Sequence, residues 1–247
     1  MRRGSVTLFA ILVTLVFSLN AFAQSKSREE IQKKIETARA DLASLEKQFL
    51  APSEADRAAF AEFLRQPNTG LIRLLPREIY DSEVYRKNKK TITMRGGGAY
   101  YSFSRRTHEY GYGSDIELDS GYLSVGFAGA DYGLLYKVGD VALDEITVEQ
   151  PNLRFMSEYV PPTAEPEARM EARKFGQGTS VDGITYKRRL PVEVDTTYLL
   201  RSINYSETDV LVAVRVVRKD SDGSVILAWK MLRNYPVPKL AQTASTQ

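Results

Sequence analysis

The chain has 247 residues, no cysteine and a formal net charge of +3 at pH 7. The absence of cysteine excludes disulfides, thiolate metal sites and thiol catalysis. Because a chain of this length can bury a large hydrophobic core without covalent cross-links, we expect a globular fold that packing alone stabilises.

Residues 1–23 have the pattern of a secretory signal peptide. Two arginines follow the initiating methionine, an almost unbroken apolar run covers 6–19, and Ala21-Phe22-Ala23 places alanine at the two positions that a signal peptidase recognises. The apolar run is shorter than the roughly 20 residues that a helix needs to cross a bilayer, which argues against the alternative of an uncleaved membrane anchor. We therefore expect a soluble product, secreted or periplasmic, that begins after Ala23.

Cleavage there removes Arg2 and Arg3, so the formal charge falls from +3 by two to +1. A nearly neutral chain has little tendency to bind nucleic acid through bulk charge, and we expect no nucleic-acid partner. No later segment has the length and apolarity of a membrane span, so no membrane-spanning segment is expected in the mature protein.

The pattern of 24–70 predicts a helical hairpin. Ser27-Arg28-Glu29-Glu30 has the form of a capping box, which places the start of the first helix there. Apolar residues then recur at steps of four and three, as in a coiled coil, at Ile31, Ile35, Ala38, Leu42, Leu45 and Phe49. This apolar stripe is short, so we expect it to pack on the chain's own body as a monomer, with a helix-mediated dimer as the alternative.

A second helix is expected to complete the hairpin. Pro52 ends the first helix, the stretch 53–56 begins the second, and 68–70 closes it. Phe60, Phe63 and Leu64 can then meet the apolar stripe of the first helix.

The sequence pattern of residues 71–238 predicts a β-rich domain, called the β body below. Strands are clearest at Thr197–Tyr205, Val210–Arg218 and Ser224–Leu232, as an antiparallel meander. The turn at 220–223 resembles the start of a calcium loop but lacks its later acidic ligands. Both faces of these strands are apolar and need cover, so the expected fold is α+β, with an αα-hairpin before a mainly antiparallel body that is barrel-like or two-layered. Residues 239–247 are expected to be a disordered tail.

The stretch 95–133 holds nine of the 16 glycines and six of the 14 tyrosines. We expect strands at Thr91–Arg95 and Ala99–Ser104 around three glycines, and a hairpin in which Asp115–Leu118 pairs with Tyr122–Phe127. Glycines serve such turns by allowing positive φ. The spacing matches neither a phosphate-binding loop nor a dinucleotide site, so no cofactor is expected.

Tyrosines alternate with cationic side chains in this stretch, which makes it the candidate binding surface. Tyrosine offers a flat apolar face with a polar tip and arginine offers planar donors, a combination that suits a sugar ring, a peptide or an anionic polymer. Core packing is the alternative for individual tyrosines. The candidate ligand-binding residues are Tyr100, Tyr101, Arg105, Arg106, His108, Tyr110 and Tyr112.

Support for catalysis is weaker. His108 could join Ser102 or Ser104 and Asp115 in space, but the sequence contains no G-x-S-x-G elbow and no H-E-x-x-H helix, and no metal site is expected. The sequence favours a non-catalytic binding or structural protein of the cell envelope or extracellular space, with an envelope polymer or glycan as its partner. The alternative is a secreted hydrolase acting on an envelope polymer or glycan, which a pair of carboxylates could support.

The signal-peptide pattern makes one direct prediction. Protein isolated from its host should begin at Gln24, because signal peptidase cuts after Ala23. Intact-mass measurement checks this, and a mass that retains residues 1–23 would contradict it.

Overall fold

A computed structural model describes residues 5–81, 92, 94–127 and 129–241, with the side chains of 5–26 left out. The chain divides into two compact units, Met1–Phe49 and Leu50–Gln247. Across the helices described in these ranges, none combines the length and apolarity required to pass through a membrane.

The first unit is formed by helix α1 (Ser5–Leu50). It ends two residues before Pro52, as the sequence predicts. Ser27 lies inside α1 rather than at its start, because the preceding residues continue the helix and leave no unpaired amides for a capping box to satisfy. The packing of the apolar stripe of α1 stays a prediction.

The second predicted helix is shorter than expected. Helix α2 (Glu54–Ala59) begins with a capping box between Ser53 and Asp56, as expected. It ends at Ala59 and is followed by the 3₁₀ turn η1 (Phe63–Arg65). This turn stops before Gln66, because Pro67 disfavours helical geometry at the residue before it. Phe60 and Phe63 pack against a core cluster of the β body. The pairing of α1 with α2 in a hairpin stays a prediction.

Five antiparallel strands form sheet A. Their spatial order is β1 (Thr69–Leu74), β11 (Val225–Asn234), β10 (Thr208–Lys219), β9 (Thr196–Asn204) and β5 (Tyr132–Gly139). The last three strands of the chain are the predicted meander. The stretch at 220–223 is a turn, in which the amide of Gly223 donates to the carbonyl of Asp220 at 3.0 Å.

Sheet B has four shorter strands in the order β2 (Tyr100–Tyr101), β3 (Ile116–Asp119), β4 (Tyr122–Ser124) and β8 (Arg189–Pro191). The expected hairpin is present as β3 and β4, which pair antiparallel. Ser120 and Gly121 make its turn with φ of 51° and 76°, a two-residue turn whose twist matches that of the strands.

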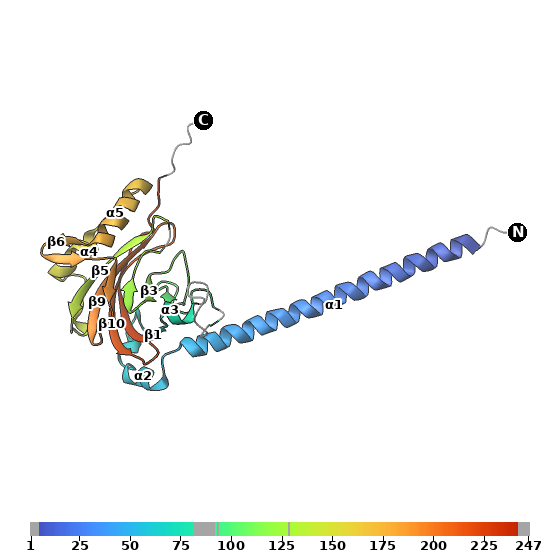
Figure 1. Ribbon diagram of the computed structural model, residues 1–247, viewed down its shortest axis with the longest axis horizontal. Coiled ribbons are helices and arrows are strands. Elements are labelled where there is room, and N and C mark those ends of the chain that lie inside the picture. The colour runs from blue at the N-terminus through green and yellow to red at the C-terminus, as the bar shows by residue number, and fades with distance from the viewer. Residues whose placement is uncertain (1–4, 82–91, 93, 128, 242–247) are drawn as a thin grey trace, which may run out of the picture. The chain divides into compact units, whose positions relative to one another are not determined.

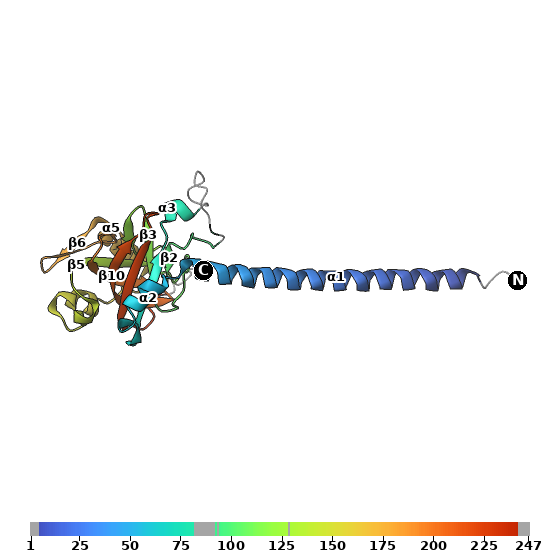
Figure 2. The ribbon, with the colours of Figure 1, turned by 90° about the horizontal axis from the view of Figure 1, so that it is seen from below.

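Shorter elements complete the second unit. They are α3 (Arg77–Tyr80), η2 (Leu143–Glu145), η3 (Pro151–Leu153), α4 (Arg154–Glu158), α5 (Glu165–Gln177), β6 (Thr179–Val181) and β7 (Ile184–Tyr186). The fold is therefore α+β with a β-rich body. In Figure 1, and from below in Figure 2, β3 and α3 lie on one side of sheet A while α5 lies on the other.

Sheet A is covered by a hydrophobic cluster on each face. The cluster toward sheet B takes Val212 and Val214 of β10 together with Ile116 and Leu123 of sheet B. The opposite cluster takes the intervening β10 residues, Leu211 and Ala213, together with residues of α4 and α5. This confirms that both faces of the meander are buried. The described strands form separate open sheets rather than a closed barrel.

The C-terminal segment remains in contact with the body as far as the structure describes it. Leu240 packs against the cluster on the helical side, and the amide of Ala241 donates to the carbonyl of Thr163 at 2.8 Å. The remainder of the tail that we expected to be disordered, 242–247, lies outside the described residues.

Arg201 of β9 lies inside the cluster on the helical side, with only 1% of its surface exposed. Its guanidinium donates from Nε and Nη2 to the two carboxylate oxygens of Asp209, each at 2.9 Å. Nη1 donates to the carbonyls of Met156 and Tyr159, at the end of α4, at 2.6 and 2.7 Å. The guanidinium also lies 3.8 Å from the ring centroid of Tyr235. Arg201 thus joins sheet A, α4 and the segment after β11.

This arrangement predicts a large effect of removing Arg201. Arg201→Met should lower the free energy of unfolding by about 3–5 kcal/mol, because Asp209 and two carbonyls lose their buried partner. Burial already raises the pKa of Asp209, against the hydrogen bonds and charge of Arg201. Chemical denaturation provides the measurement.

The control is Arg154→Ala, which removes an exposed ion pair with Glu158 and should cost less than about 1 kcal/mol. The double variant Arg201→Met with Asp209→Leu should recover part of the loss, because no charge then remains unpaired. Equal losses in the Arg201 and Arg154 variants would contradict the assigned role of Arg201.

Candidate functional site

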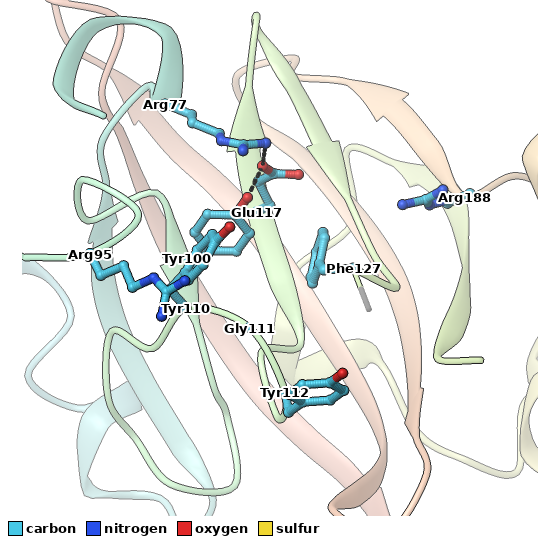
Figure 3. A pocket seen from close by; sticks show the side chains of 9 residues that line it. All are labelled: Arg77, Arg95, Tyr100, Tyr110, Gly111, Tyr112, Glu117, Phe127 and Arg188. Carbon is cyan, nitrogen blue, oxygen red and sulfur yellow. Dashed lines mark hydrogen bonds and ion pairs between the residues drawn. The ribbon is translucent and has the colours of Figure 1, made fainter. Parts of the chain in front are cut away.

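A pocket of about 390 Å³ opens beside sheet B on its face away from sheet A. Figure 3 shows its lining side chains. They come from α3, the glycine turn before β2, strands β2 and β3, the loop between these two strands, and the segments next to β4 and β8. The lining residues are Arg77, Arg95, Tyr100, Tyr110, Gly111, Tyr112, Glu117, Phe127 and Arg188.

Strand alternation decides which tyrosine reaches the pocket. Successive side chains of a strand point to opposite faces, so the neighbours Tyr100 and Tyr101 separate. Tyr101 belongs to the cluster between the sheets, whereas Tyr100 lines the pocket. Glu117 is the cross-strand partner of Tyr100 on β3 and lies on the same face.

Glu117 and its two donors form the polar base of the pocket. The hydroxyl of Tyr100 donates to Oε1 of Glu117 at 2.5 Å, and Nη1 of Arg77 donates to the same oxygen at 2.9 Å. Burial raises the pKa of Glu117, against the hydrogen bond from Tyr100 and the charge of Arg77. Burial and the hydrogen bond to Glu117 in turn raise the pKa of Tyr100.

Arg95 and Arg188 give the pocket an excess of positive charge. The ion pair among the lining residues joins Arg77 to Glu117, and in the described part of the chain neither Arg95 nor Arg188 pairs with a carboxylate. Arg95 lies 5.0 Å from the ring centroid of Tyr110, and Nε of Arg188 donates to the carbonyl of Val125 at 3.0 Å. Figure 3 shows the two arginines on opposite sides of the pocket with aromatic rings between them.

The aromatic walls of the pocket come from the loop between β2 and β3 and from the segment after β4. Tyr110 packs edge-on against Tyr100, with ring centroids 5.0 Å apart, and Phe127 meets Tyr100 in the same way at 5.3 Å. Tyr110 is 37% exposed and Tyr112 is 65% exposed, so both present ring surface to solvent. Exposed rings beside guanidinium groups that no described carboxylate neutralises have the chemistry to contact a flat, negatively charged molecule.

A glycine turn places Arg95. The amide of Gly97 donates to the carbonyl of Met94 at 3.1 Å, and all three glycines of 96–98 have positive φ. Because the turn begins at Met94, the expected strand Thr91–Arg95 is wrong at Met94 and Arg95, and Ile92 is in no strand either. Thr91 and Thr93 lie outside the described residues. The expected strand Ala99–Ser104 shortens to β2.

Three of the candidate binding residues line the pocket, namely Tyr100, Tyr110 and Tyr112. The two arginines of the set lie elsewhere. Arg105 forms ion pairs with Glu109 and Glu207, and the guanidinium of Arg106 lies 5.5 Å from the ring centroid of Trp229.

His108 and Tyr101 contribute to the core side of the loop. Nε2 of His108 lies 2.6 Å from the carbonyl oxygen of Arg73, and its ring meets Tyr101 at 5.3 Å. Burial lowers the pKa of His108, against the hydrogen bond with the carbonyl of Arg73. Tyr101 is 5% exposed, in agreement with the core-packing alternative.

The described residues do not form a Ser-His-Asp arrangement. Oγ of Ser102 lies 3.4 Å from Oδ2 of Asp115, but the described hydrogen-bond partner of His108 is the carbonyl of Arg73. Asp115 accepts from the amide of Phe103 at 2.8 Å, and burial raises its pKa to about 6 against that hydrogen bond. Asp115 therefore holds the loop in place. Within the same ranges no cluster of His, Asp and Glu could hold a metal ion.

Sequence reasoning missed six residues of the pocket: Arg77, Arg95, Gly111, Glu117, Phe127 and Arg188. The β3–β4 hairpin carries a signal for Glu117, because alternation places it opposite the apolar Ile116 and Leu118. Arg188 carries no such signal, since its approach to Val125 depends on the pairing of β8 with β4, segments far apart in the sequence.

Comparison with known proteins finds no matching family, no similar curated protein and no similar solved structure. The function of the chain is therefore argued from the geometry and charge of the pocket.

The glycine turn makes a prediction about stability. Gly97→Ala should lower the free energy of unfolding by at least about 2 kcal/mol, because Ala is strained at a φ of 64° and its Cβ would lie 2.7 Å from the backbone nitrogen of Asp81. Gly111→Ala is the matched control, since φ is 96° there and nothing lies within 4 Å of the added atom. Thermal unfolding compares the variants, and equal losses would contradict a packing role for Gly97.

Proposed function

We propose that this chain is an exported, non-catalytic binding protein of the cell envelope or extracellular space, and that its pocket holds an acidic sugar of an envelope glycan. The observation that carries this proposal is the pair of arginines, Arg95 and Arg188, that enter an aromatic pocket without a described carboxylate partner. Their charge favours an anion, and their planar donors suit a carboxylate.

The aromatic rings favour a sugar over an inorganic anion. Tyr110, Tyr112 and Phe127 supply flat apolar surface, on which the carbon–hydrogen face of a sugar ring can pack. The volume of about 390 Å³ lies within the range of about 300–1,000 Å³ that is common for small-molecule sites. A simple ion would leave most of this space and the rings unused.

The carboxylates of the pocket favour binding over hydrolysis. Glycoside hydrolysis ordinarily uses two carboxylates, one on each side of the bond that breaks. Of the described residues that line the pocket, Glu117 is the single carboxylate, and Oε1 already accepts from Arg77 and Tyr100. The hydrolase alternative thus lacks the second acid in this pocket.

Export is supported by the sequence. The charged start, the apolar run at 6–19 and Ala21-Phe22-Ala23 match a cleaved signal peptide, and a cysteine-free chain folds without an oxidising environment. The proposed location is therefore periplasmic or secreted, where acidic glycans are accessible.

Calorimetric titration with digalacturonate tests the proposed ligand class. The mature protein should bind the acid, and Arg95→Ala or Arg188→Ala should weaken binding roughly tenfold or more, because each removes a charge-assisted hydrogen bond. Tyr110→Ala should weaken binding through loss of ring contact. Arg173→Ala is the control on α5, with an exposed side chain outside the pocket, and should bind as the wild type does.

The methyl ester of the same disaccharide provides a matched ligand, because it keeps the rings and removes the charge. It should bind weakly to all variants. Equal affinity for acid and ester, or unchanged affinity in both arginine variants, would overturn the assignment of the pocket.

A further inference from the structure

The face of sheet B that bears the pocket continues across the strands beyond it. Strand register aligns four residues in one row, Tyr100 with Glu117, Glu117 with Ser124, and Ser124 with Arg189. Side chains of one such row point to the same face. The first two line the pocket, and Arg189 lies at the opposite edge of the sheet, on β8.

At that edge, the guanidinium of Arg189 stacks on an aromatic ring, as that of Arg95 does on Tyr110 in the pocket. Its Cζ lies 4.1 Å from the ring centroid of Tyr122, and Nη2 donates to the carbonyl of Asp119 at 3.2 Å. Tyr122 is two residues before Ser124 on β4, so it shares the face of the row, and it is 39% exposed. The hydrogen bond to Asp119 and the stacking fix the guanidinium in place.

The charge of Arg189 is not neutralised by a carboxylate in the described ranges. Its neighbour Arg188 lines the pocket, so two adjacent residues carry cationic groups to the pocket and to the Tyr122 edge. The pocket and this edge therefore offer the same chemistry, an exposed tyrosine ring beside an arginine. Repetition of that chemistry along one face fits a ligand that repeats.

The distance between the two places sets the size of the ligand. Tyr100 and Arg189 are separated by three strand intervals, which corresponds to about 14 Å. One sugar ring cannot reach from Tyr100, at the far side of the pocket, to Arg189. A chain of acidic sugars that crosses the strands of sheet B can contact both.

We propose that Tyr122 and Arg189 form a second subsite, and that the ligand is a linear polyanionic glycan whose acidic residues occupy the pocket and this subsite together. The inference rests on the proposed function of the pocket. It adds the length of the ligand and the direction of its path, from β2 toward β8. A purely structural role for the pair, in which Arg189 protects the exposed edge strand β8 from pairing, is the competing explanation.

Titration with galacturonate oligomers of two and six residues tests the second subsite. The wild type should bind the hexamer at least about tenfold more tightly than the dimer, because a second tethered contact adds to the first. Tyr122→Ala and Arg189→Gln should remove most of this gain and leave the affinity for the dimer unchanged. Arg154→Ala, on α4, is the control and should keep the full gain.

Folding is checked by thermal unfolding of each variant. Tyr122→Phe keeps the ring, so it should retain both the stability and the gain in affinity for the hexamer. If the alanine variant unfolds, Arg189→Gln tests the subsite with Tyr122→Phe as the folded control. Polyglutamate of matched charge should bind less tightly than the hexamer, since it has no rings to pack on tyrosine.

The outcomes separate the two proposals. A hexamer that binds no more tightly than the dimer overturns the second subsite and leaves the pocket assignment intact, as does a hexamer gain that survives in both variants. An equal loss of dimer and hexamer affinity in Tyr122→Ala also overturns the second subsite. If polyglutamate binds as tightly as the hexamer, the assignment of a sugar ligand to the subsite is overturned. Failure of every oligomer to bind overturns the proposed function itself.

Discussion

The fold depends on the burial of both faces of sheet A. Strands β9 to β11 carry apolar side chains on both sides, so exposure of either face would remove much of the hydrophobic stabilisation. Sheet B covers one face, and helices α4 and α5 belong to the cover of the other. Because one side of sheet B is used for this purpose, its other side is left to polar and aromatic residues. The pocket is a consequence of that division.

Much of this arrangement could be predicted from local pattern. Alternating valines marked β10, and the hairpin at Asp119-Ser120-Gly121 was signalled by its turn residues. The strand expected after the glycines at 96–98 is present as the shorter β2, but the strand expected before them is wrong at Met94 and Arg95, because nothing in the sequence specifies that all three glycines adopt positive φ in one turn. The pocket was predicted in part, since the tyrosines come from one segment, whereas Arg77 and Arg188 arrive through contacts between distant segments.

The base of the pocket is electrically balanced, whereas its rim carries positive charge that no described carboxylate neutralises. Glu117 is neutralised by Arg77 and hydrogen-bonded by Tyr100, so the base is rigid and has little net charge. Arg95 and Arg188 stand around it, positioned by the glycine turn and by the carbonyl of Val125. A rigid base and pre-positioned charges reduce the entropy that a ligand must lose on binding.

The pairing of β1 with β11 joins the first strand of the body to the last. Sheet A therefore cannot be completed until nearly the whole chain has been synthesised, and contacts between such distant segments form slowly. For the export that we propose, this topology would leave sheet A incomplete while the chain passes through a secretion channel that accepts only unfolded chains, and folding would be completed on the far side of the membrane.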